Sequence, residues 1–236
     1  GGGSALLEAA GPDNTVYVAS EIGALVASGA IPVEPDVEAI NRYFHFRFVP
    51  EPATPLLHVR KLRAGHLMAL SPASPQPAPR QYWNVSAIPP LHGDPVEIIR
   101  ADLEDIGRII VRSDVPVGVA LSGGLDSSIV ASLAVRHSPG TVTAFSVGYE
   151  GRPACDERAD ASAFAQHLGI DMVEVELSAG DVVSGFEGLV ADMSEPVADA
   201  AGSSYRALMQ AARRAGIKVL LHGPGADETI KRYSRM

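Results

Sequence analysis

The chain has 236 residues, 46% of them hydrophobic, which is enough for one substantial domain and part of another around a large buried core. Its formal net charge is −9, from 19 Lys and Arg against 28 Asp and Glu, which argues against a nucleic-acid partner. Cys155 is the only cysteine, so no disulfide can form within the chain. With no signal peptide and no apolar run that could span a bilayer, we expect a soluble cytoplasmic protein without a membrane partner.

The first third of the sequence predicts a small β-containing region, two helices and a linker. Residues 5–20 combine β-forming stretches with a turn, and a helix is expected over residues 21–27. A second helix is expected over residues 36–48, because Asp36 can cap its first turn. Residues 49–90 are rich in proline, which excludes a regular helix and indicates a connecting segment.

From about residue 94 the pattern changes to amphipathic helices that alternate with short apolar strands. This alternation predicts an α/β fold, a parallel sheet with helices on both faces. Ligands of such sheets bind beyond the carboxyl ends of the strands, where both polar loops described next lie. We expect helices over 95–113, 127–136, 157–168, 180–192 and 203–215, and strands over 115–121, 141–147, 172–177 and 217–221.

A loop rich in glycine and serine follows the strand that ends at Leu121. Its glycines let the backbone approach a phosphate closely, and the next helix adds the positive end of its dipole. Asp126 would repel a phosphate, but a Mg²⁺ ion that bridges the anions explains it. The residues expected to bind the pyrophosphate part of a nucleotide are Ser122, Gly123, Gly124, Leu125, Asp126, Ser127 and Ser128.

The string SGGLDSS lacks the lysine of a Walker A loop and the spacing of a dinucleotide site. A glycine turn with serines that cap a helix is the simpler alternative, but the full string between a strand and a helix disfavours it. The string resembles the PP-loop of the ATP pyrophosphatases, which include the asparagine, GMP, NAD and argininosuccinate synthetases. This resemblance implies a protein that binds ATP with Mg²⁺ and cleaves it between the α- and β-phosphates.

A second loop, residues 220–228, also follows a strand and resembles the asparagine synthetase motif SG(D/E)G(A/S)DE. The resemblance implies that Asp227 and Asp126 are catalytic and together hold the metal. His222 stands where the family has serine, and Pro224 where it has an acid linked to nitrogen transfer. The resemblance also implies that the adenine lies near Ala120, Val147, His222 and Gly223.

Other motifs resemble the asparagine synthetase family in the same order, from about residue 15 to residue 228. The resemblance implies a fragment of three parts. Residues 1–30 are the remnant of a glutaminase-like, or glutamine amidotransferase, domain; residues 31–92 are a linker; residues 93–236 belong to the ATP-pyrophosphatase synthetase domain. The matching motifs are ASEIGAL (19–25), FVPEPATP (48–55), VRKLRAGH (59–66), FSVG (145–148) and the Glu195-Pro196 pair.

By this resemblance the protein is a carbon–nitrogen ligase of amino-acid biosynthesis that forms AMP and activates an aspartate-like carboxylate. Its other substrate is ammonia or an amine, and a homodimer is the assembly that the resemblance allows. Since Gly1 is no nucleophile, we do not expect this chain to hydrolyse glutamine. One alternative is a β-lactam synthetase or lasso-peptide macrolactam cyclase of the same superfamily. Pro224 also leaves open a nucleotide-binding relative without turnover.

Overall fold

The structure, a computed structural model, divides the chain into two compact units that we describe separately. Unit 1 contains residues 92–187 and 201–236, and unit 2 contains residues 2–91 and 188–200. The residues described are 6–11, 15–71, 78–154, 156–199 and 201–223.

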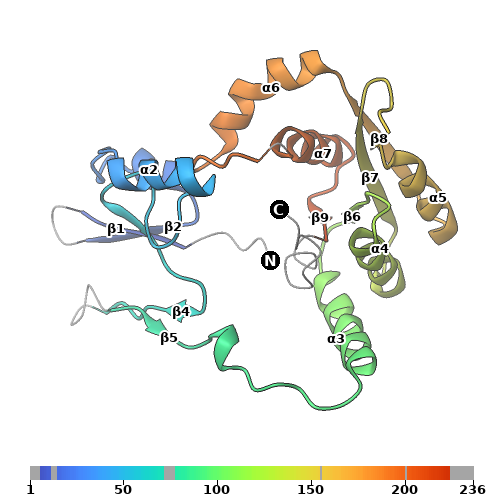
Figure 1. The fold of residues 1–236 in the computed structure, drawn as a ribbon, viewed down its shortest axis with the longest axis horizontal. Helices are drawn as coiled ribbons and strands as arrows, with labels where there is room; N and C mark the ends of the chain where they lie inside the picture. The colour runs from blue at the N-terminus through green and yellow to red at the C-terminus, as the bar shows by residue number, and fades with distance from the viewer. Residues whose placement is uncertain (1–5, 12–14, 72–77, 155, 200, 224–236) are drawn as a thin grey trace. The chain divides into compact units, whose positions relative to one another are not determined.

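A parallel four-stranded sheet forms the centre of unit 1 (Figure 1). Its strand order is β8-β7-β6-β9, and every neighbouring pair is parallel. Val119 of β6 lies opposite both Ala144 of β7 and Leu221 of β9, so the carboxyl ends of these three parallel strands point to the same end of the sheet. The strands are β6 (Val117–Ala120), β7 (Val142–Tyr149), β8 (Met172–Leu177) and β9 (Val219–Leu221).

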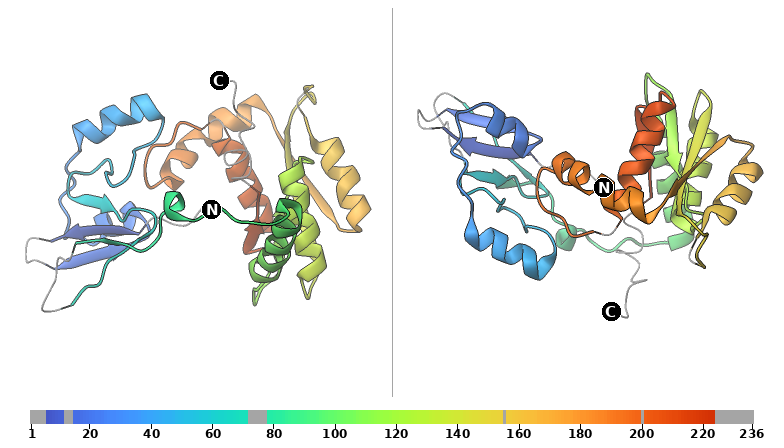
Figure 2. Two further views of the ribbon diagram at one scale, coloured as in Figure 1. Left: turned by 60° about the horizontal axis from the view of Figure 1, so that its bottom comes forward. Right: turned by 90° about the horizontal axis from the view of Figure 1, so that it is seen from above.

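Helices cover both faces of this sheet, which confirms the predicted fold class (Figure 2). Alternate residues of each strand point to opposite faces. Val119 and Ala144 pack with α4 and α5 on one face, whereas Phe145 packs with α7 on the other. The helices of this part of the chain are α3 (Pro95–Ile110), α4 (Leu125–His137), α5 (Arg158–Leu168), α6 (Ala179–Asp192) and α7 (Gly202–Arg214).

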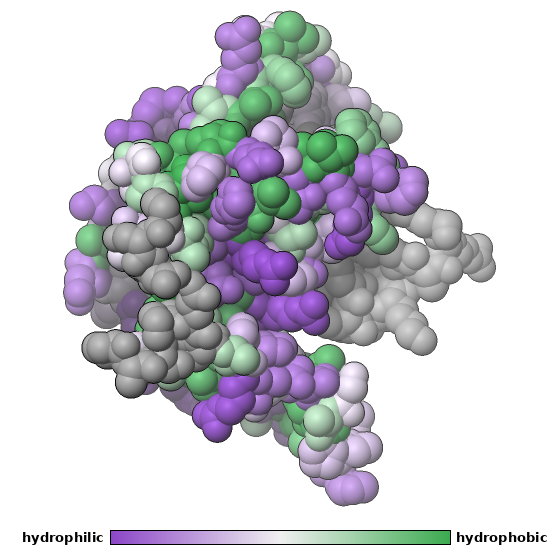
Figure 3. All heavy atoms as spheres, turned by 90° about the vertical axis from the view of Figure 1, so that its left-hand side faces the viewer, coloured by the Kyte–Doolittle hydropathy of each residue, from purple (hydrophilic) through white to green (hydrophobic). Residues whose placement is uncertain are grey.

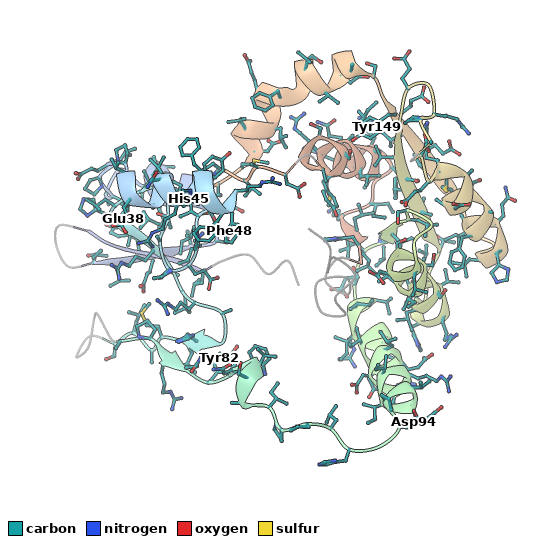
Figure 4. All side chains as sticks on the ribbon, in the orientation of Figure 1. Glu38, His45, Phe48, Tyr82, Asp94 and Tyr149 are labelled. Carbon is teal, nitrogen blue, oxygen red and sulfur yellow. The ribbon has the colours of Figure 1, made fainter. Side chains whose placement is uncertain are left out.

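The helix ends follow from local chemistry, and most bounds lie within a few residues of those predicted. Asp94 caps α3, where its Oδ1 accepts the Val96 N–H at 2.9 Å (Figure 4). Helix α5 ends at Gly169, whose φ of +69° suits a glycine C-cap. Helix α4 begins at Leu125, two residues before the predicted start, which places Asp126 inside its first turn.

Unit 2 is built on a three-stranded antiparallel sheet of order β2-β1-β3. Strand β3 comes from the proline-rich segment that we expected to be a connection, and that segment also contains a second small sheet and a short 3₁₀ helix. The core residues are Leu7, Ala9, Ile22, Leu25, Ile31 and Val59. The elements are β1 (Leu7–Ala10), β2 (Val16–Ala19), α1 (Ile22–Ala27), α2 (Val37–Phe46), β3 (Val59–Lys61), β4 (His66–Leu67), β5 (Arg80–Gln81) and η1 (Val85–Ala87).

Residues 188–200 join unit 2 although they lie far from it in the sequence. The Ala198 N–H donates to the Arg47 carbonyl at 2.8 Å. Lys61, only 6% exposed, donates from Nζ to Glu195 Oε2 at 2.7 Å. This buried ion pair connects two segments 134 residues apart.

The surface of unit 2 carries hydrophobic side chains as well as polar ones. Green hydrophobic patches lie among hydrophilic ones on the face drawn in Figure 3. The large hydrophobic residues exposed on unit 2 include Val33, Val37, Phe44, Phe46 and Phe48. Among the helices that the structure describes, none is both long enough and apolar enough to cross a membrane.

Candidate active site

The phosphate loop, residues 122–128, turns directly from β6 into α4. Gly123 has a φ of +84°, a backbone conformation that residues other than glycine rarely adopt. Gly124 is the N-cap of α4. A helix leaves the N–H groups of its first turn without partners inside the helix, and glycine has no side chain to bond them. This geometry is suited to an anion, which would also meet the positive end of the helix dipole.

Two of the predicted serines hold the loop in shape. Ser127 is buried, and its hydroxyl donates to the Gly124 carbonyl at 3.0 Å. The Ser122 and Ser127 hydroxyls lie 3.0 Å apart, and Ser122 Oγ accepts the Gly124 N–H at 3.2 Å. The half-buried Ser128 accepts a bond at its carbonyl from the Ser132 hydroxyl at 2.8 Å. Ser127 therefore acts within the loop, and the exposed Ser122 is the better placed of the two for a ligand.

The second loop lies against the phosphate loop. If Gly223 carried a Cβ, that atom would lie 3.0 Å from both the carbonyl carbon and the oxygen of Asp126. His222, just after β9, contacts Tyr205 on α7, with 5.9 Å between the ring centroids. The structure thus brings His222 and Gly223 to the start of α4, next to Asp126.

Asp227 and Pro224 lie outside the described residues, so the predicted pair of metal-binding carboxylates is represented only by Asp126. Within the described ranges, no group of three or more His, Cys, Asp or Glu residues could hold a metal ion. Asp126 is half-buried in the first turn of α4, beside the N–H groups that suit an anion. A carboxylate at such a position fits a cation that lies between it and the anion.

The remaining residues predicted to contact adenine lie on one face of the sheet. Ala120 and Val147 are half-buried and pack on the cluster around Phe145, on the side covered by α7. Both lie toward the carboxyl ends of their strands, because Ala120 ends β6 and Val147 is two residues from the end of β7. We call Ala120 and Val147 the adenine wall.

Comparison with known protein families agrees with the resemblance found in the phosphate loop and in the second loop. The asparagine synthase family model matches residues 99–236, more than half of the chain. The chain belongs to the asparagine synthase family. The glutamine amidotransferase domain model matches residues 3–83 of this family member. The family predicted from the sequence motifs is therefore confirmed.

Curated relatives carry the names of asparagine synthetases. Asparagine synthetase [glutamine-hydrolyzing] 1 of Bacillus subtilis is 32% identical over 223 residues, which are 94% of this chain and 35% of that protein. A putative asparagine synthetase [glutamine-hydrolyzing] of Mycobacterium bovis is 33% identical over 85% of this chain and 31% of its own length. This family member thus spans about a third of the length of these relatives. A solved glutamine-dependent NAD+ synthetase of Acinetobacter baumannii has a TM-score of 0.42 and 24% identity, over 61% of this chain and 29% of that one.

Arg158, next to the site of this asparagine synthase family member, was not predicted from the sequence. It is 2% exposed, and its guanidinium pairs with Asp156 and Glu176. Hydrogen bonds from Arg158 lower the pKa of Asp156 from 3.8 to about 2, and the same bonds raise the pKa of Arg158 above its usual range. One signal could have revealed it. Arg158 precedes Ala161 and Ala165 by three and seven residues, so the helical period places it on the buried face of α5.

Proposed function

We propose that this chain is the ATP-binding part of an amide-forming ligase that activates an aspartate-like carboxylate. The observation that carries the proposal is the contact between Gly223 and the backbone of Asp126. Two loops that are far apart in the sequence, residues 122–128 and 220–228, meet at the carboxyl ends of the strands of one parallel sheet, where ligands of such folds bind. The phosphate loop alone would support only nucleotide binding, without catalysis.

In the proposed reaction ATP lies with its pyrophosphate part in the phosphate loop and its base against the adenine wall, His222 and Gly223. A carboxylate oxygen of the substrate attacks the α-phosphorus, and the bond from that phosphorus to the bridging oxygen of pyrophosphate breaks. The nitrogen of ammonia or an amine then attacks the acyl carbon, loses a proton and displaces AMP. Asp126 and Asp227 would hold Mg²⁺, which supplies charge neutralisation for the pyrophosphate. The chain itself contributes orientation and oriented N–H dipoles.

Exchange of labelled pyrophosphate into ATP in the presence of Mg²⁺ tests the proposal. We expect exchange that depends on an added carboxylate, with aspartate as the first candidate. Asp126→Asn should abolish it while the thermal unfolding curve is kept, because the amide preserves the shape and removes the charge. Asp102→Asn, on the exposed side of α3, is the matched control and should exchange normally. If Asp126→Asn exchanges at a near-normal rate, the metal-binding role proposed for Asp126 is wrong. If the wild type shows no exchange with any carboxylate, the proposed ligase activity is wrong.

Pro224 supports a second candidate, a synthetase whose substrate carries its own amine. Proline cannot accept a proton, so the acid that the family has at this position is missing. Product that forms from a substrate with an internal amine, without ammonia, would favour the ring-closing reaction. If Pro224→Glu raises amide formation from ammonia without changing pyrophosphate exchange, the asparagine synthetase-like reaction is favoured.

A further inference from the structure

A buried arginine ties together three elements at one edge of unit 1. Arg158 opens α5, and its Nε donates to Asp156 Oδ1 at 3.0 Å. Its Nη1 donates to Glu176 Oε2 on β8 at 3.0 Å, and its Nη2 to the Tyr149 carbonyl at 3.0 Å. One planar group therefore fixes the start of α5 to the ends of β7 and β8.

The guanidinium lies against the backbone that carries the adenine wall. A Cβ on Gly148 would overlap with Nε of Arg158, so the arginine crosses β7 directly after Val147. Tyr149, labelled in Figure 4, ends the same strand, and its hydroxyl lies 2.8 Å from the Ser204 hydroxyl on α7. Arg158 and Tyr149 thus hold this strand end from opposite faces of the sheet.

The same turn of α5 also touches the phosphate loop. A Cβ on Gly123 would lie 2.8 Å from Asp160 Cβ and 2.9 Å from the Ala161 nitrogen. Arg158 is two residues before Asp160 on this helix, so one helical turn contacts both the strand that carries Val147 and the phosphate loop. Val147 and Gly123 are therefore linked through one side chain and one helical turn.

Stability is a weak explanation for such a group. Removing an arginine and the Asp156 carboxylate from water costs free energy that their attraction barely repays, and well-packed apolar residues often serve as well. What the planar fork supplies is fixed geometry, because it bonds several acceptors in set directions.

Resting on the function proposed above, we propose that Arg158 is a positioning residue that sets the spacing between the adenine wall and the phosphate loop. Arg158 thereby determines how much the adenine base adds to the affinity for ATP, beyond the affinity that the triphosphate supplies. The Arg158 guanidinium is already bonded to Asp156, Glu176 and the Tyr149 carbonyl, so the proposed role acts through the strand end and requires no contact with ATP.

The test compares dissociation constants of ATP and inorganic tripolyphosphate, both with Mg²⁺, measured by calorimetry on the full chain. Tripolyphosphate binds through the phosphate loop alone, so the ratio of the two constants reports on the base. Arg158→Lys keeps the charge but not the fork. It should weaken ATP binding about tenfold, because the base then no longer fits the wall while the phosphates stay in their loop. This variant should bind tripolyphosphate as tightly as the wild type does.

Two further variants keep the inference testable if Arg158→Lys unfolds. Gly148→Ala moves the guanidinium without a change of charge and should have the same selective effect. Arg152→Lys is the matched control, an exposed arginine that pairs with Glu174 at 3.4 Å, and it should leave both constants unchanged.

Equal weakening of both ligands, or of neither, in Arg158→Lys and Gly148→Ala would overturn the positioning role. The positioning role would also be overturned if the wild type bound ATP no more tightly than tripolyphosphate. If the wild type binds neither ligand, the proposed function itself fails, and this inference fails with it.

Discussion

At the scale of single residues, Gly123 meets two demands of the phosphate loop. Its φ of +84° is rare for any other residue, and the start of α5 occupies the space that a side chain would need. The two demands are independent, because one comes from the chain itself and the other from a neighbouring helix. A substitution at Gly123 is therefore expected to displace the loop.

Gly123→Ala should lower pyrophosphate exchange by at least about tenfold and the free energy of unfolding by about 1–3 kcal/mol. Gly140→Ala is the matched control, since nothing lies within 4 Å of the added methyl group and its φ is not positive. It should change stability by less than about 0.5 kcal/mol. Exchange assays and urea unfolding measure both effects, and equal behaviour of the two variants would contradict the role given to Gly123.

Much of the candidate site could be predicted residue by residue because its motifs are local. The string around Asp126 and the end of β9 are read directly from neighbouring residues. Helix α4 begins two residues before the predicted start, because Gly124 is its N-cap and the Ser127 hydroxyl, inside the helix, bonds back to the Gly124 carbonyl. Arg158 was missed because Glu176, one of its partners, belongs to a separate strand.

At the scale of elements, the sequence pattern predicted each helix and strand that the structure describes in unit 1. Strand β3 was missed in the proline-rich segment. It has three residues, too few for a period to show, and it exists because Leu7 and Ala9 of β1 pair with it. Such pairing between distant segments leaves no local pattern.

The ion pair between Lys61 and Glu195 connects β3 with the segment that follows α6. Lys61→Met should lower the free energy of unfolding by about 2–3 kcal/mol, less than for a fully buried pair because Glu195 is 25% exposed. Fluorescence of Trp83, the only tryptophan, reports on unit 2 during urea unfolding.

Arg60→Met, at the exposed neighbouring position, is the control for this prediction. Adding Glu195→Leu to Lys61→Met should restore part of the loss, since no charge is then left without its partner. Purely additive effects of the two substitutions would show that the pair does not act as a unit.

At the scale of the whole molecule, the chain passes between its two units three times. The domain boundaries expected after residues 30 and 92 stay a prediction, although the first passage lies between residues 91 and 92. The later passages, at 187/188 and 200/201, could not be predicted from composition, since no proline-rich or charged stretch marks them.

The stability of the molecule should decrease in acid through carboxylates of unit 1. Hydrogen bonds from Arg158 hold the pKa of Asp156 at about 2, below its ordinary 3.8. Hydrogen bonding to His137 lowers the pKa of Glu104, and bonds from Ser178 lower that of Asp181. Because these folded-state values lie below the unfolded ones, their stabilisation is complete above about pH 5 and is lost as the pH falls toward 2.

Urea unfolding between pH 7 and pH 2 measures this decrease by far-UV circular dichroism. Asp181→Asn removes one of the three carboxylates and should make the decrease shallower. A free energy of unfolding that stays constant or rises below pH 4 would contradict the assignment.

The segment at residues 188–200 has a consequence for how such chains recombine. A single crossover near residue 91 that joins the first part of one relative to the second part of another would carry Lys61 from one parent and Glu195 from the other. Working chimeras should therefore arise mainly when both positions come from the same parent, or when the parents agree at both. The two units would then be inherited as a matched set, even though each is compact by itself.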